Sequence, residues 1–282
     1  MIAAGAKMKR MEAATCGLLK IVARVGRFAN EHWRALQYVA AVVGTVLYTS
    51  LCPGCWTRDV RKKLARQIMA VGVEPFGFVC ALAVFVGISV VVQLSFWTGE
   101  TGQSQLLGPL LVAIVARELG PVLINLVVIV RSGSAMTTEL GVLKVSGEFG
   151  GLEEQGSDLF LHQVMPRVLG VAVSTFGLTI VFILVAFASG YLFAAWMGKG
   201  SRDLFLFADA VSKAVHPKDV LSVLAKSILP ALFASAACCI GGLGVGGSVK
   251  DIPQATQRAL TRSVAGLFVI STVVSLLTYV KP

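Results

Sequence analysis

The chain has 282 residues, of which 56% are hydrophobic and only 14% are charged, and its net charge is +10 at pH 7. Long apolar runs recur from about residue 74 to the C-terminus, which excludes a soluble domain and predicts an integral membrane protein. Many of the basic residues flank these runs, as is typical of cytoplasmic anchoring, so the positive charge does not indicate a nucleic-acid partner.

The N-terminal region is basic and is not a convincing signal peptide, because no short apolar core leads to a small-residue cleavage site. Residues 35–51 are apolar, but basic clusters lie on both sides, so a span here would place one cluster on the wrong side. We expect residues 35–51 to form a helix in the cytoplasmic interface, and residues 57–72 to form an amphipathic helix that leads into the membrane. The sequence therefore predicts a cytoplasmic and interfacial region over residues 1–73 and a transmembrane domain over residues 74–282.

Five segments of this domain are apolar enough to cross a bilayer core of about 30 Å. They cover about Pro75–Trp97, Leu106–Leu143, Val168–Met197, Val220–Ile240 and Ser263–Val280. The second segment is too long for one span, so it either projects from the membrane or bends near Pro121, where a helix hydrogen bond is lost. The loop over residues 98–105 has no Lys or Arg and is expected outside, which places the N-terminus in the cytoplasm and the C-terminus outside.

The polar connections carry few chemical signals. Residues 203–214 have the pattern of a short amphipathic helix on the outer face, and residues 241–262 are expected to form a Gly-rich loop and its continuation. The GxGxxG pattern over residues 242–247 follows a membrane span instead of a strand, so it predicts a turn and not a nucleotide site. The CxxC formed by Cys52 and Cys55 has no accompanying ligands and predicts a turn between two helices.

A polar stripe is expected in the second segment. Glu118, Asn125, Ser132 and Glu139 are each seven residues apart, so a regular helix places them close to one face. Arg117 and Arg131 fall together on a neighbouring face. Charges at membrane depth normally face the interior of a bundle or an aqueous cavity, which points to function. The alternative is an interhelical salt-bridge network that only fixes the packing.

Several stretches of the chain resemble the core signature of the MlaE (YrbE) family of ABC-transporter permeases. The stretches are Arg117-Glu-Leu-Gly-Pro121, Arg131-Ser-Gly-Ser-Ala135, Glu139-Leu-Gly141 and Lys144-Val145, and the similarity extends to Arg66-Gln67, Met165-Pro-Arg167 and Ala255-Thr256. The resemblance covers roughly residues 61–280. It implies an all-α integral membrane protein with an N-terminal interfacial helix, five transmembrane helices and a cytoplasmic coupling helix between spans two and three.

The resemblance also implies an assembly and a cargo. Two copies of the permease would pair as a homodimer with separate P-loop ATPase subunits, which bind the ATP, and with a ring of MCE-domain proteins outside. The cargo would be a membrane lipid, such as a phospholipid. The chain would then lie in a bacterial inner membrane with its C-terminus in the periplasm, and it would bind no cofactor itself.

Residue roles follow from the same resemblance and from charge. The polar groups expected near the path of the lipid headgroup are Arg66, Arg117, Glu118 and Lys226, and a cation among them could hold a phosphate. Residues 146–155 stand where the family's ATPase-coupling segment lies, with candidate contacts at Ser146, Glu148, Leu152, Glu153 and Glu154. The chain departs from the family pattern here, because glycines at 147, 150 and 151 each weaken a helix by about 1 kcal/mol relative to Ala.

Two rival function classes remain open. A stand-alone ion-coupled secondary transporter or channel would use the polar stripe as a proton or ion path and would need no ATPase. A membrane-embedded enzyme is the weaker rival, since no catalytic residues and no metal ligands stand out and the three histidines are scattered. The sequence also has no GxxxxGK[ST] motif for holding the phosphates of ATP.

Overall fold

The computed structural model describes residues 37–52, 54, 56–101, 110–148, 160–196 and 216–279. Every regular element in these ranges is a helix, and five of the helices are long and apolar enough to cross a membrane. The expected all-α, multi-pass architecture is therefore confirmed. The chain divides into two compact units, Met1–Gly44 and Thr45–Pro282, and the five long helices all lie in the second.

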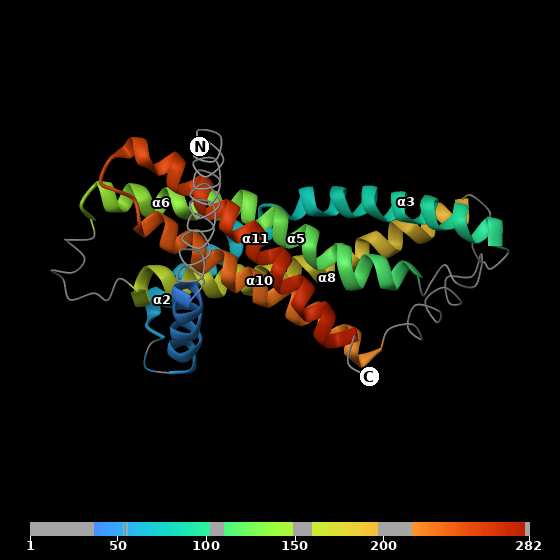
Figure 1. The fold of residues 1–282 in the computed structure, drawn as a ribbon, viewed down its shortest axis with the longest axis horizontal. Helices are drawn as coiled ribbons and strands as arrows, with labels where there is room; N and C mark the ends of the chain where they lie inside the picture. Colours follow the sequence, from blue (N-terminus) through green and yellow to red (C-terminus); the bar gives the residue numbers. More distant parts are fainter. Residues whose placement is uncertain are drawn as a thin grey trace, which may run out of the picture. The chain divides into compact units, whose positions relative to one another are not determined.

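The elements of the second unit follow one another as long helices with short π-helical or 3-10 segments between them (Figure 1). In chain order they are α2 (Arg58–Ile68), η2 (Met69–Val73), α3 (Phe76–Thr101), η4 (Val112–Leu119), α5 (Gly120–Val128), η5 (Ile129–Gly133), α6 (Ser134–Val145), η6 (Phe160–Val164), α8 (Met165–Trp196), α10 (Pro217–Leu243), η7 (Val249–Asp251) and α11 (Ile252–Tyr279). A shorter apolar helix, Gln37–Leu51, precedes them. The outer helix expected over residues 203–214 lies outside the described residues.

The first spanning helix begins in the basic α2. The hydroxyl of Thr57 accepts a hydrogen bond from the backbone N–H of Val60, which caps the helix, and Asp59 places a carboxylate in the first turn. The helix then continues through η2 into α3 as one segment, Arg58–Phe96. An amphipathic helix thus leads directly into the first apolar span, and the domain boundary expected at residue 73 lies within this continuous segment.

The second spanning segment, Val112–Val145, also continues without a break. Its 34 residues would extend about 50 Å at 1.5 Å per residue, which is longer than the bilayer core. The helix passes Pro121 by widening into η4, where the N–H of Gly120 donates to the carbonyl of Val115, five residues back. The structure thus shows one unbroken helical segment that is longer than the core and has π-helical geometry just before Pro121.

The last span differs from the sequence prediction. Residues 241–262 were expected to form a loop, but α10 continues to Leu243 and α11 begins at Ile252, so only a short connection separates them. In that connection Gly247 has φ +87°, a conformation that favours glycine. The prediction was wrong because the first turns of α11 are polar, and hydropathy detects only the part of a helix that suits lipid.

Close approach between helices holds the unit together. α3 packs along α8 and α10 packs along α11 (Figure 1). At the first contact Val79, Ala83, Phe182 and Ala186 are fully buried. A Cβ on Gly87 would lie 2.4 Å from the carbonyl oxygen of Ala186, so only glycine permits this distance. Small residues allow such packing in lipid, where van der Waals contact replaces the hydrophobic effect as the driving force.

Gly87→Ala is expected to destabilise the protein by about 1–3 kcal/mol, because the added methyl group forces α3 away from α8. Gly77→Ala is a matched control on the same helix, since a Cβ there would meet nothing within 4 Å. The control is expected to be neutral or slightly stabilising. Thermal unfolding of both variants in one detergent checks this, and equal melting temperatures would contradict it.

Candidate functional site

Two ion pairs join η4 to α10. The Nη2 atom of Arg117 lies 2.9 Å from Oδ2 of Asp219, and the Nζ atom of Lys226 lies 2.6 Å from Oε1 of Glu118. Asp219 and Lys226 are seven residues apart on α10, which is two helical turns, so both face η4. The cation and the anion that are adjacent on η4, Arg117 and Glu118, are therefore each paired with an opposite charge on α10.

Asp219 has two roles in this arrangement. Its Oδ2 atom also accepts a hydrogen bond of 2.9 Å from the backbone N–H of His216, which completes a capping box at the start of α10. Its side chain is only 5% exposed, so the carboxylate is held by these contacts. The sequence prediction missed Asp219 as a partner of Arg117, although its seven-residue spacing from Lys226 was a usable signal.

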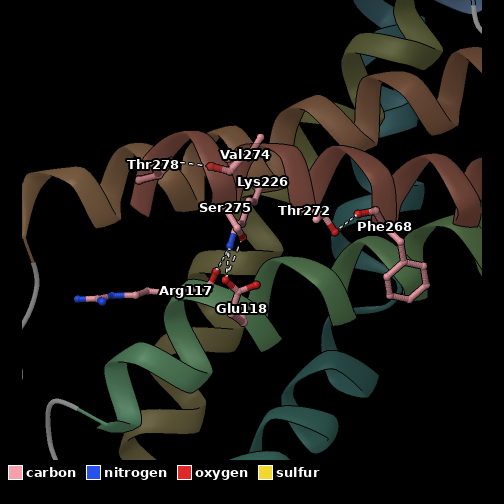
Figure 2. Close-up of polar contacts among 8 residues, drawn as sticks. All are labelled: Arg117, Glu118, Lys226, Phe268, Thr272, Val274, Ser275 and Thr278. Carbon is pink, nitrogen blue, oxygen red and sulfur yellow. Dashed lines mark hydrogen bonds and ion pairs between the residues drawn. The ribbon is translucent and has the colours of Figure 1, made fainter. Parts of the chain in front are cut away.

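Arg117, Glu118 and Lys226 form a cluster, and Lys226 at its centre is fully buried. Its ammonium group donates to the carboxylate of Glu118 and, at 2.9 Å, to the backbone carbonyl of Arg117. The carboxylate of Glu118 also accepts a hydrogen bond of 3.1 Å from the hydroxyl of Ser275 on α11. Figure 2 shows Glu118 turned toward Lys226 and Ser275, while the guanidinium of Arg117 points away from them. Three helical segments thus meet at one carboxylate that remains half exposed.

Two prolines explain why backbone carbonyls are available to this cluster. Pro121 has no N–H, so the carbonyl of Arg117 lacks its α-helical donor four residues later, and Lys226 donates to it instead. Pro230 similarly deprives the carbonyl of Lys226 of a donor, and the side-chain amide of Asn125 donates to it at 3.2 Å. Each helix therefore satisfies a carbonyl that a proline has freed on the other helix.

Asn125→Leu is expected to destabilise the protein by about 1–3 kcal/mol, because it leaves the carbonyl of Lys226 buried without its amide donor. Adding Pro230→Ala should recover part of this loss, since alanine restores a backbone N–H four residues after Lys226. Chemical denaturation of the single and double variants measures both effects. An Asn125→Leu protein as stable as the parent, or a double variant with no recovery, would contradict this explanation.

Comparison with known proteins identifies the family of this chain. The family model described as Permease MlaE matches residues 64–277, which is most of the chain. The chain belongs to the MlaE permease family. It is therefore a multi-pass membrane permease of the ABC-transporter type, which is a transporter subunit.

Three relatives show how far this permease is similar to named proteins. It is 28% identical over 243 residues to the chloroplastic protein TRIGALACTOSYLDIACYLGLYCEROL 1 of Arabidopsis thaliana, covering 86% of this chain and 67% of that one. It is 26% identical over 209 residues to a probable ABC transporter permease of Synechocystis, covering 74% and 79%. It is also 26% identical over 252 residues to the intermembrane phospholipid transport system permease protein MlaE of Haemophilus influenzae, covering 87% and 92%.

The expected polar stripe of this MlaE-family permease does not stay on one face. Asn125 faces α10, but the face toward α10 continues through Gly133 and Thr137, whose hydroxyl donates to the carbonyl of Cys238 at 3.1 Å. The step from Asn125 to Gly133 is eight residues instead of seven, because the wider π-helical turns of η5 lie between them. Beyond η5, the seven-residue spacing no longer keeps residues aligned.

The polar residues at and beyond η5 consequently have other surroundings. Ser132 is buried, Glu139 pairs with Arg167 at 3.1 Å, and Arg131 pairs with Glu74 at 3.2 Å. Arg117 and Arg131 were expected to share a face, but Arg117 pairs with α10 whereas Arg131 pairs with the connection between η2 and α3. The structure therefore places Glu118 and Asn125 against α10, and it places Arg131 and Glu139 against other elements.

The four expected headgroup contacts do not all come together. Arg117, Glu118 and Lys226 meet in the cluster, but Arg66 lines a separate cavity with Glu139 and Arg167. In the expected coupling segment, Ser146 ends α6 and Gly147 adopts φ +75°, which stops the helix. Glu148 is exposed just beyond it. The other three candidates, Leu152, Glu153 and Glu154, lie outside the described residues.

Proposed function

We propose that this permease moves a phospholipid through the membrane, and that the lipid headgroup contacts the cluster of Arg117, Glu118 and Lys226. The observation that carries the proposal is a buried ammonium group paired with a half-exposed carboxylate between two long apolar helices. Ionisable groups at such positions mark substrate paths in membrane proteins. The name of the Haemophilus relative, a phospholipid transport permease, supports the choice of cargo.

The proposed contact between the headgroup and Lys226 implies two states of the permease. Its side chain has no exposed surface here, so a headgroup reaches it only when α10 moves away from η4. In that open state the phosphate would replace Glu118 and Asp219 as the partner of Lys226 and Arg117, through charge-assisted hydrogen bonds. The two ion pairs then act as the contacts that stabilise the closed state.

We propose that the energy for this change comes from outside the chain. Two permease copies would form a homodimer, and separate P-loop ATPase subunits would bind the segment around Ser146, Glu148 and residues 152–154. ATP binding would favour one of the two states by its differential affinity for them. A ring of MCE-domain proteins would receive or deliver the lipid on the opposite side. The permease would lie in a bacterial inner membrane, with its N-terminus cytoplasmic and its C-terminus periplasmic.

Affinity purification of the tagged full-length permease from its native membrane tests this assembly. We expect a P-loop ATPase and an MCE-domain protein to co-purify, and Glu148→Lys to reduce recovery of the ATPase without reducing recovery of the MCE protein. A permease that purifies alone and still conducts ions in vesicles would contradict the proposal and favour an ion-coupled transporter or channel.

A further inference from the structure

A small cavity lies where α5 and α6 pack against α10. Its volume is about 10 Å³, and every residue that lines it is buried. Asn125 lines it from α5, Met136 lines it from α6, and Ser235 and Cys238 line it from α10. No residue of the charged cluster belongs to its lining, so the cavity is a separate feature of the packed helices.

Asn125 carries an unsatisfied acceptor beside this cavity. Its Nδ2 atom donates to the carbonyls of Pro121 at 2.8 Å and Lys226 at 3.2 Å, so both of its N–H groups are in use. Its Oδ1 atom is buried and, among the residues that the structure describes, accepts no hydrogen bond. The whole residue is only 1% exposed, so bulk water does not satisfy this oxygen. A buried polar group without a protein partner is commonly satisfied by an ordered water.

Ser235 supplies a second polar group from the opposite helix. Its hydroxyl hydrogen donates to the backbone carbonyl of Ala231 at 2.7 Å, which leaves the hydroxyl oxygen able to accept a hydrogen bond. The thiol of Cys238 is a weaker donor or acceptor in the same lining. A water molecule has two O–H donors, so one water can serve Asn125 and Ser235 together.

The size and polarity of the cavity select its occupant. A cavity must offer about 10–15 Å³ to hold one water, and this one reaches the lower limit. Any organic ligand is therefore too large. The lining contains no charged side chain, so nothing there would balance a bare ion.

We propose that this cavity binds one buried water molecule, which donates to Oδ1 of Asn125 and to the hydroxyl of Ser235. The water thereby joins two membrane-spanning segments that also exchange hydrogen bonds through the amide nitrogen of Asn125. It completes the hydrogen bonding of the side chain that satisfies the carbonyl freed by Pro230. This water site is independent of the proposed transport function.

X-ray radiolysis of the full-length permease in detergent tests for this water. Short X-ray pulses convert water to hydroxyl radicals, which oxidise side chains close to the point where they form, and mass spectrometry locates the oxidised residues. Met136 and Cys238 suit this measurement, because thioether and thiol groups oxidise readily. The matched controls are Met165 and Cys239, which are also buried but do not line the cavity.

We expect Met136 and Cys238 to be oxidised severalfold faster than Met165 and Cys239, because only the first two residues lie beside the bound water. Equal rates within either pair of like residues would overturn the proposal. The comparison is made within the parent protein, so it does not depend on how a substitution affects folding.

Two valine substitutions on α10 assign the oxidation to the cavity. Ala231 lines the cavity, so Ala231→Val occupies the space of the water and should lower the oxidation of Met136 to the rate of Met165. Ala236 is buried on the same helix outside the lining, so Ala236→Val should leave Met136 at the parental rate. If Ala231→Val leaves Met136 unchanged, or if both variants lower its oxidation equally, radicals reach Met136 by another route and the proposal is wrong.

Discussion

Lys226→Met is expected to reduce lipid transport more than tenfold, while the protein still folds. Methionine keeps most of the volume of the buried side chain but removes the ammonium group and its bonds to Glu118 and to the carbonyl of Arg117. Hydrogen bonds to charged groups contribute about 1.5–3 kcal/mol, and each 1.4 kcal/mol corresponds to about a tenfold change in rate. ATP-driven transfer of a fluorescent phospholipid by the reconstituted complex measures the loss.

Lys218→Met is the matched control for this prediction. Lys218 lies on the same helix, α10, but is exposed and outside the cluster. The control should transport at about the rate of the parent protein. If Lys226→Met also transports normally, the headgroup role of the cluster is wrong, and its ion pairs serve only to pack the helices.

Asp219→Asn is expected to lower the free energy of unfolding by about 1–3 kcal/mol. Breaking a buried ion pair costs about 3–5 kcal/mol, but the side chain of Arg117 is 27% exposed and recovers part of its solvation. Asparagine retains the shape of the side chain and an oxygen that can accept from the N–H of His216. The loss should therefore come mainly from the charge. Reversible denaturation in detergent measures it.

A double-mutant cycle identifies the partner of Asp219. The coupling energy between Asp219→Asn and Arg117→Gln should exceed about 0.5 kcal/mol, the range in which independent sites add. Asp251→Asn, at an exposed carboxylate on η7, should change stability little and show no coupling to Arg117→Gln. Additive effects of Asp219→Asn and Arg117→Gln would show that the ion pair is not a stabilising contact in the native protein.

The architecture could be predicted because hydropathy reports directly on the lipid environment. Five apolar segments predicted the five long helices, and the basic α2 predicted the amphipathic start of the first. The start of α11 at Ile252 was missed, since helical turns outside the lipid leave no hydropathy signal. Lys226 was found because a lysine within an apolar run is costly and therefore informative.

The geometry of the site could be predicted only in part, because it depends on contacts between distant segments. The π-helical turns of η5 shift every later residue, and nothing in the local sequence distinguishes them from α-helix. The carbonyl that Pro230 leaves without a donor is satisfied only because Asn125 faces α10. Each proline can be read as freeing one carbonyl, but the donor that satisfies it comes from about a hundred residues away in the chain.

The most direct test of the proposed function is the energy source of lipid transfer between vesicles. We expect the permease reconstituted with the proposed ATPase and MCE-domain partners to transfer a fluorescent phospholipid only while ATP is hydrolysed. Transfer should persist when proton and sodium gradients are dissipated, and Lys226→Met should reduce it more than tenfold. Transfer driven by an ion gradient in vesicles that contain the permease alone would contradict the account.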